Sequence, residues 1–150
     1  MNRHTWHAAL RAAGAGVMAV DLVMNGEVEN AFCAVRPPGH HAEREAAMGF
    51  CFFNNIAVAA AHALEAHRLS RVAIIDFDVH HGNGTQDIFE DDPAVLYCST
   101  HQMPLYPGTG AKTETGVGNI VNAPLNPGDG SADFRDAVRS RVLPALDNFR

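Results

Sequence analysis

Residues 72–85 read Val-Ala-Ile-Ile-Asp-Phe-Asp-Val-His-His-Gly-Asn-Gly-Thr. Residues 72–75 form an uninterrupted apolar run rich in β-branched side chains, which predicts a buried strand. Acidic side chains and histidines follow that strand directly. In open parallel sheets, ligand sites form at the carboxyl ends of the strands. The stretch therefore predicts an α/β fold with a functional site immediately after this strand.

Helical and strand patterns alternate on both sides of residues 72–75. The patterns predict helices over residues 6–24, 53–67, 85–89 and from 131 onward, and further strands over 31–35, 95–99 and 120–125. Asn54 or Asn55 is expected to cap the second helix, and Ser131 the last. Such alternation indicates a mainly parallel sheet with helices on its faces. We therefore expect a three-layer α/β/α architecture in which the helix over 6–24 is mostly buried.

The length, apolar content and net charge limit the classes of protein to which this chain could belong. The chain has 150 residues, 47% of them apolar, and a formal net charge of −6. This length suffices for one sizeable core, and the acidic excess argues against binding to nucleic acid or to an anionic membrane surface. Residues 8–24 are apolar but interrupted by Arg11 and Asp21, so we expect neither a signal peptide nor a membrane span. The cysteines form no CxxC pair, which favours a reducing compartment and a cytoplasmic location.

Asp76, Asp78 and His80 occupy alternate positions of the run that begins as the buried strand. While a chain stays extended, alternate side chains project to the same side, so these three could converge on one point. Carboxylate oxygen together with imidazole nitrogen suits a borderline divalent ion such as zinc or iron. In the alternative interpretation, the aspartates only cap the following helix and the histidines lie on the surface.

His40 and His41 follow the sequence Arg-Pro-Pro-Gly at residues 36–39. Prolines restrict the backbone, so two adjacent imidazoles are held on a stiff loop. One ring could act as a general base near neutral pH and the other as an acid or electrostatic partner. The alternative is a pair that faces solvent. The other histidines in helical segments are interpreted as structural or solvated: His4, His7, His62 and His67.

Aromatic residues gather in two further segments. Residues 49–55 read Gly-Phe-Cys-Phe-Phe-Asn-Asn, a composition that also suits core packing at the start of a helix. Residues 104–110, rich in proline and glycine, form either a plain loop or an ordered rim with an aromatic wall.

Four motifs together resemble the histone deacetylase family, including its bacterial deacetylase-like and acetylpolyamine amidohydrolase members. They are Arg-Pro-Pro-Gly-His-His at 36–41, Gly-Phe-Cys-Phe-Phe-Asn-Asn at 49–55, Asp-Phe-Asp-Val-His-His-Gly-Asn-Gly-Thr at 76–85 and Tyr-Pro-Gly-Thr-Gly at 106–110. The first motif and Asn83 look like the class II branch. The resemblance implies an arginase/deacetylase-like fold, with residues 1–150 as an incomplete, central part of one catalytic domain that lacks its N- and C-terminal portions.

The resemblance implies two metal sites. Asp78 and His80 match two of the three protein ligands of a catalytic Zn²⁺, with Fe²⁺ as an alternative. Asp76 matches a ligand of a structural K⁺, which Asp78, Ser99 and the carbonyls of His80 and Thr100 would complete. The family's third zinc ligand, an aspartate, and its transition-state tyrosine have no counterpart among these residues.

The resemblance also implies catalytic roles. His41 would be the general base, and His40 would assist electrostatically. Asp76 would orient His40, and Asn83 would hydrogen-bond to His41. Three residues match positions that contact the substrate, namely the two aromatic walls of a tunnel and a carbonyl that accepts from the substrate amide: Phe50, Tyr106 and Gly49.

The implied function is a zinc-dependent deacetylase that hydrolyses an acetylated lysine side chain or an acetylpolyamine to acetate and free amine. A non-catalytic acyl-amine binding or assembly module is the alternative. The related ureohydrolases also bind metals at strand ends, but the motif at 36–41 is out of place there. With two zinc ligands and a partial sheet, we expect the isolated chain to be nearly inactive and poorly soluble or homo-oligomeric.

Overall fold

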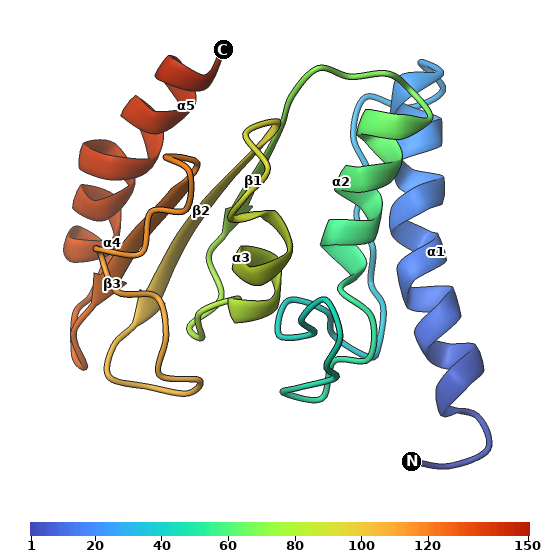
Figure 1. Ribbon diagram of the computed structural model, residues 1–150, viewed down its shortest axis with the longest axis horizontal. Coiled ribbons are helices and arrows are strands. Elements are labelled where there is room, and N and C mark those ends of the chain that lie inside the picture. Colours follow the sequence, from blue (N-terminus) through green and yellow to red (C-terminus); the bar gives the residue numbers. More distant parts are fainter.

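The computed structural model describes all of residues 1–150. Helices and strands alternate along most of the chain, as predicted (Figure 1). The elements are α1 (Thr5–Met24), α2 (Asn55–Glu65), β1 (Val72–Asp76), α3 (Asn83–Phe89), β2 (Val95–Gln102), β3 (Ile120–Leu125), α4 (Ser131–Ala137), the π-helical turn η1 (Val138–Val142) and α5 (Leu143–Phe149).

The three strands form one parallel sheet in the order β1-β2-β3. The central strand β2 is buried along nearly its whole length, which explains its apolar first half over residues 95–98. Asp76 at the end of β1 pairs with Ser99 of β2, and Ser99 pairs in turn with Asn122 of β3. Polar residues of all three strands therefore meet at the carboxyl end of the sheet.

Helices cover both faces of the sheet, so the predicted three-layer α/β/α architecture is confirmed (Figure 1). On one face, Ala60 of α2 and Phe89 of α3 pack with Tyr97 of β2. On the other face, Leu96 of β2 packs with Val142 of η1, and apolar residues of α5 extend this second cluster. Neighbouring residues of β2 thus serve opposite cores, as the alternation of side chains along a strand requires.

Helix α1 packs outside α2 rather than in the core. Gly16 permits the close approach, since a Cβ there would lie 3.1 Å from the Cβ of Ala59. Only Ala9, Ala12 and Ala13 of α1 are buried, so the prediction of a mostly buried helix is wrong. By length and composition alone α1 is long and apolar enough to cross a membrane, so the expectation that the chain has no membrane span stays a prediction. Its contacts with α2 account for its small residues, whereas several of its large apolar side chains are exposed.

The strand predicted over residues 31–35 is absent, and this segment is irregular. A strand needs a neighbouring strand for its backbone hydrogen bonds, and this segment has none. It lies instead against α1, where the Cys33 thiol contacts the carbonyl oxygen of Ala15 at 3.5 Å. Residues 31–34 are exposed, so their apolar character does not reflect burial within the described chain.

Hydrogen bonds identify the residues that cap α2 and α4. The backbone N–H of Ala57 donates to the Asn54 side chain at 3.1 Å, which makes Asn54 the cap of α2. Ser131 does not cap the last helix. Gly130 takes that position, and its N–H donates to the carboxylate of Asp133 at 2.9 Å. The predicted final helix is also interrupted by η1.

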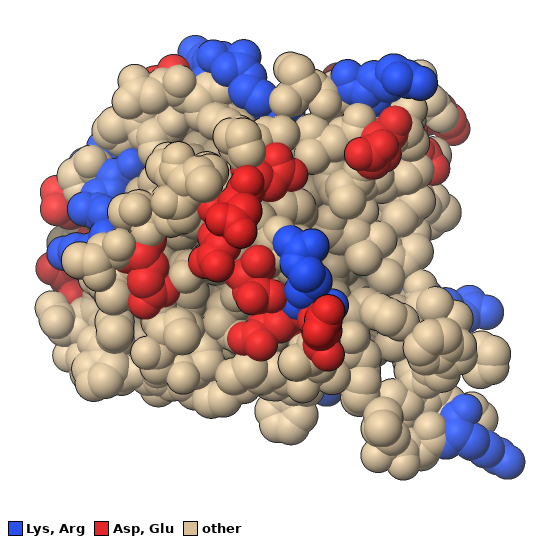
Figure 2. Space-filling view, in the orientation of Figure 1, with Lys and Arg blue, Asp and Glu red and all other residues tan.

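Charge is unevenly distributed over the surface. Figure 2 shows acidic side chains gathered near the middle of one face, while most Lys and Arg side chains lie toward its rim. With a net charge of −6, the molecule attracts cations more readily than anions.

Candidate active site

The chain turns immediately after β1, and aspartate side chains brace the turn. Oδ1 of Asp76 accepts the backbone N–H of Asp78 at 3.1 Å, and Oδ1 of Asp78 accepts the backbone N–H of His80 at 2.7 Å. Because β1 ends at Asp76, the extended alternation on which the sequence argument relied does not continue. The turn, rather than the strand, sets the positions of Asp78 and His80.

The structure brings the side chains of Asp78 and His80 together. Their Oδ1 and Nδ1 atoms lie 3.1 Å apart, and both side chains are partly exposed. Two ligand atoms of a tetrahedral ion with bonds of about 2.0 Å are separated by roughly 3.3 Å. The separation and the donor types therefore fit Zn²⁺. No third His, Cys, Asp or Glu side chain joins this pair.

Asp76 does not converge with Asp78 and His80, so that part of the prediction is wrong. Its Oδ2 instead accepts from Nδ1 of His40 at 2.8 Å and from the hydroxyl of Tyr97 at 3.0 Å. This agrees with the orienting role that the family resemblance implies for Asp76. The Asp76 carboxylate therefore holds the ring of His40, and only Asp78 and His80 remain as a pair of possible metal ligands.

His40 and His41 are held by the first turn of α3. The N–H groups of Gly84 and Thr85 donate to the carbonyl oxygen of His40 at 3.0 and 3.2 Å. Gly84 is required there, because a Cβ would overlap the backbone carbonyl of Ala42. The two imidazole rings have centroids 4.1 Å apart. A tight backbone contact, rather than the prolines alone, therefore fixes the histidine pair.

The two histidines have different partners and opposite pKa shifts. Burial disfavours the charged form of His40, but the hydrogen bond and charge of Asp76 outweigh it and raise the pKa of His40. Burial lowers the pKa of His41, and its hydrogen bond to Asn83 offsets only part of this effect. The pKa shifts therefore favour the charged form of His40 and the neutral form of the adjacent His41.

Asn83 links His41 to the carboxylate of Glu43, a residue that the sequence analysis did not identify. Oδ1 of Asn83 lies 2.8 Å from Nδ1 of His41, and its Nδ2 donates to the Glu43 carboxylate at 2.7 Å. With the amide in this orientation, Oδ1 accepts the Nδ1–H of His41 and leaves Nε2 of that ring as the acceptor. Asn83 therefore selects the tautomer that a general base needs.

A cavity of about 590 Å³ contains the metal donors, the histidine pair and the predicted substrate-binding residues. The ring centroids of Tyr106 and His41 lie 5.1 Å apart. Phe50 is 88% exposed and stands at the rim, and Gly49 has a positive φ of 55° with no room for a Cβ beside the His41 ring. The lining residues are Pro38, His40, His41, Gly49, Phe50, Asp78, His80 and Tyr106.

Ser99 and Thr100, implied ligands of K⁺, lie in buried positions of β2. The hydroxyl of Ser99 is 2.9 Å from Nδ1 of His101, and Ser99 is the register partner of Asp76. The Thr100 hydroxyl is buried without a hydrogen-bond partner. These placements leave the potassium site a prediction.

Tyr97 is a second residue that the sequence analysis missed. It is fully buried in β2, and burial raises the pKa of its hydroxyl well above the ordinary value. The hydroxyl therefore stays protonated and donates to Asp76. A tyrosine within an otherwise apolar strand was the available signal, because a buried phenol needs a partner.

A parallel sheet with these side chains at the carboxyl ends of its strands is the framework of an α/β enzyme. The whole chain, residues 1–150, matches the family model for the histone deacetylase domain. It is 46% identical over 146 residues to a probable deacetylase of Archaeoglobus fulgidus, covering 95% of this chain and 40% of that protein. It is 47% identical over 155 aligned residues to the polyamine deacetylase HDAC10 of Homo sapiens, covering 97% of this chain and 23% of that protein.

The structure is likewise similar to a solved one. A crystal structure of the HDA15 HD domain matches with a TM-score of 0.87 and 45% sequence identity, covering 95% of this chain and 43% of that one. The chain belongs to the histone deacetylase family, which confirms the resemblance and the arginase/deacetylase-like fold. It spans less than half the length of these relatives, 40% and 23% for the two proteins named above.

Proposed function

We propose that this chain contributes the histidine pair and two metal ligands to a zinc-dependent deacetylase, which hydrolyses an acetylated amine to acetate and free amine. The observation that carries the proposal is the position of His41. Its ring is held through Nδ1 by Asn83, lines the same cavity as Asp78 and His80, and has a lowered pKa. A neutral imidazole beside a metal donor pair is the arrangement that general-base hydrolysis needs.

Asp78 and His80 would hold the metal ion. Their separation and donor types fit Zn²⁺, and Fe²⁺ accepts the same donors. A bound ion of this kind polarises a carbonyl group and acidifies water. Metal analysis of the purified protein distinguishes the two ions.

His41 and His40 would divide the proton transfers. Nε2 of His41 has no hydrogen bond within the protein, so it can accept the proton of the attacking water. The hydrogen bond and charge of Asp76 raise the pKa of His40 and favour its charged form, which would add positive charge where the acetyl oxygen becomes negative. The departing amine then takes its proton from the imidazolium of His41.

The cavity would take the acylated end of a chain-like amine. Phe50 and Tyr106 line this cavity and would contact a methylene stem, and the Gly49 carbonyl would accept from the substrate amide. Acetyl-lysine in a protein and an acetylpolyamine share this stem. A polyamine carries further positive charge, which the net charge of −6 favours.

The potassium site would lie behind this cavity. Asp76, at the end of β1, is the register neighbour of Ser99 within β2. A bound K⁺ would take carbonyl and side-chain oxygens there.

The test is acetate release by the full-length protein in the presence of Zn²⁺, from an acetyl-lysine peptide and from an acetylated polyamine. We expect His41→Ala to lower kcat/KM by about 100-fold or more. His7→Ala is the matched control, because His7 lies exposed on α1, and it should leave the rate unchanged. Equal rates for His41→Ala and wild type would contradict the proposal. Binding of the acylated amine without acetate release would instead support the non-catalytic binding module.

A further inference from the structure

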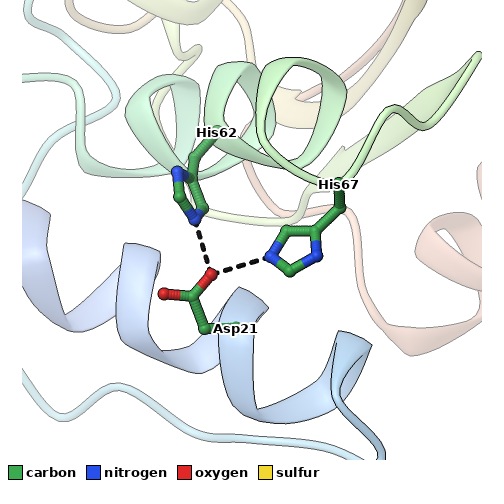
Figure 3. A group of neighbouring side chains, drawn as sticks. All are labelled: Asp21, His62 and His67. Atoms are coloured by element: carbon green, nitrogen blue, oxygen red, sulfur yellow. Dashed lines mark hydrogen bonds and ion pairs between the residues drawn. The ribbon is translucent and has the colours of Figure 1, made fainter.

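A second group of potential metal ligands lies between α1 and α2. Oδ1 of Asp21 is 2.6 Å from Nε2 of His62 and 2.7 Å from Nε2 of His67 (Figure 3). Figure 3 shows both rings pointing toward the same carboxylate oxygen from the end of α2 and the turn after it. This is the one group of three His, Cys, Asp or Glu side chains whose ligand atoms all lie within 4.8 Å of one another.

The cluster is separate from the candidate active site. His62 lies near the end of α2, and a short connection joins this end of α2 to the start of β1 at Val72. Asp78 and His80 follow the last residue of β1. The cluster and the cavity therefore lie toward opposite ends of β1 (Figure 1). None of the three residues belongs to the four family motifs.

The position of the cluster calls for a cation. Helices α1 and α2 run in the same direction, so their C-terminal ends lie side by side (Figure 1). Each helix end carries about half a negative charge, and Asp21, in the last turn of α1, adds a full one. Neither last turn contains Lys or Arg. A divalent ion held by Asp21, His62 and His67 would offset this negative charge.

The backbone holds the three side chains in place. Ala63, one residue after His62, is buried, and the small residues on this face of α2 let α1 approach closely. Arg68 adopts a positive φ of 55°, a costly conformation for a residue with a Cβ. This turn directs His67 back toward α1. The three ligands therefore come from segments that are fixed independently of one another.

The donor atoms need only a small adjustment to bind an ion. Ligand atoms of a tetrahedral ion with bonds of about 2.0–2.1 Å are roughly 3.3 Å apart. The two Nε2–Oδ1 distances of 2.6 and 2.7 Å would lengthen by a fraction of an ångström. The Asp21 side chain is 45% exposed, which leaves access for the ion and for a water as fourth ligand.

We propose that Asp21, His62 and His67 form a second metal site, distinct from the deacetylase site, which binds a borderline divalent ion such as Zn²⁺ and ties the end of α1 to the end of α2. Two imidazole nitrogens and one carboxylate oxygen are ligands that Zn²⁺ prefers. Nδ1 of neither ring has a hydrogen-bond partner in the protein. A metal-binding histidine without a hydrogen bond to its second ring nitrogen typically binds its ion about 10- to 100-fold more weakly. We therefore expect this site to exchange its ion readily.

The test measures zinc in full-length protein that carries Asp78→Asn and His80→Ala, which removes the active-site donors. Equilibrium dialysis against Zn²⁺ should give one zinc ion per chain more in this background than in the same background with His62→Gln and His67→Gln. Glutamine keeps an N–H donor for Asp21, so both proteins should fold, which far-UV circular dichroism checks. His4→Gln with His7→Gln is the matched control and should bind as much zinc as the background.

Thermal unfolding gives a second readout that is independent of enzyme activity. Added Zn²⁺ should raise Tm of the background progressively with concentration, because the ion binds the folded state. The rise should be smaller when His62 and His67 are both replaced. Equal zinc content and equal shifts in Tm with and without these two histidines would overturn the proposal and leave the cluster a hydrogen-bonded contact only. Either result leaves the deacetylase proposal untouched, because the background lacks its donors.

Discussion

Nδ1 of His41 lies 2.8 Å from Oδ1 of Asn83, whereas Nδ1 of the adjacent His40 lies 2.8 Å from a carboxylate oxygen of Asp76. An amide supports one ring and a carboxylate supports the other. The pKa of His41 is lowered, chiefly by burial, whereas Asp76 outweighs burial and raises the pKa of His40. The pair is therefore divided into a ring held by an amide, with a lowered pKa, and a ring held by a carboxylate, with a raised pKa.

Replacing the amide by a carboxylate tests this division. In Asn83→Asp, a carboxylate beside His41 would stabilise its imidazolium and raise its pKa. The acidic limb of the profile of kcat/KM against pH should therefore move to higher pH. A limb that stays in place would show that His41 is not the base whose deprotonation that limb reports. Asp129→Asn, an exposed change of the same size, is the control.

The hydroxyl of Tyr97 is predicted to stabilise the fold through Asp76. Tyr97→Phe removes a hydrogen bond of 3.0 Å to a largely buried carboxylate. Hydrogen bonds to charged groups contribute about 1.5–3 kcal/mol, and we expect a loss of that size in the free energy of unfolding, measured with urea. Tyr106→Phe, whose hydroxyl makes no hydrogen bond in the protein, should change stability little. Equal losses in both variants would contradict this account.

Gly84 and Gly14 make a matched pair of glycine-to-alanine substitutions. At Gly84, a Cβ would overlap the backbone of Ala42, which cannot move aside easily, so Gly84→Ala should cost about 1–3 kcal/mol or more. At Gly14, inside α1, no atom lies within 4 Å of the added Cβ. Gly14→Ala should therefore stabilise the protein by about 0.5–1 kcal/mol. Chemical denaturation of both variants measures the difference, and a tolerated Gly84→Ala would refute the tight contact.

Buried histidines should make the protein sensitive to acid. Burial lowers the pKa of His81 to about 4, and the neighbouring His101 ring, 4.7 Å away between centroids, adds to the effect. An unfolded histidine titrates near 6.5, so below about pH 6.5 the unfolded chain binds protons that the folded chain rejects. Stability is therefore full above that pH and is lost as the pH falls toward about 4.

Urea denaturation of metal-free protein between about pH 7.5 and about pH 4.5 measures this loss. His81→Asn removes the titrating ring, so the fall in stability with pH should be shallower than in the wild type. An unchanged slope in that variant would exclude His81 as a source of the acid sensitivity.

Local patterns in the sequence were sufficient to predict the sheet and most of the helices. The apolar run over 72–75 and the glycines after His81 placed the strand and the turn correctly. The strand predicted over residues 31–35 is wrong because a short apolar run does not specify a neighbouring strand. A strand forms only where another strand pairs with its backbone hydrogen-bonding groups. The π-helical turn in the last helix has no sequence signal of comparable strength.

Contacts across long separations in sequence were the part of the site that could not be predicted. Glu43 reaches Asn83 across 40 residues, and Asp21 reaches His62 across 41. Such pairs depend on how helices and loops pack, which periodicity does not encode. Asp76 was assigned to a common point by strand alternation, but the strand ends at that residue, so its carboxylate turns to His40 instead.

Whether Asp78 and His80 bind Zn²⁺ beside His41 can be measured by anomalous X-ray scattering from crystals of the zinc-loaded, full-length protein, recorded on both sides of the zinc absorption edge. We expect a zinc peak within bonding distance of Oδ1 of Asp78 and Nδ1 of His80, beside the ring of His41. A map with no zinc peak between these two side chains, whatever it shows near Asp21, would contradict the account.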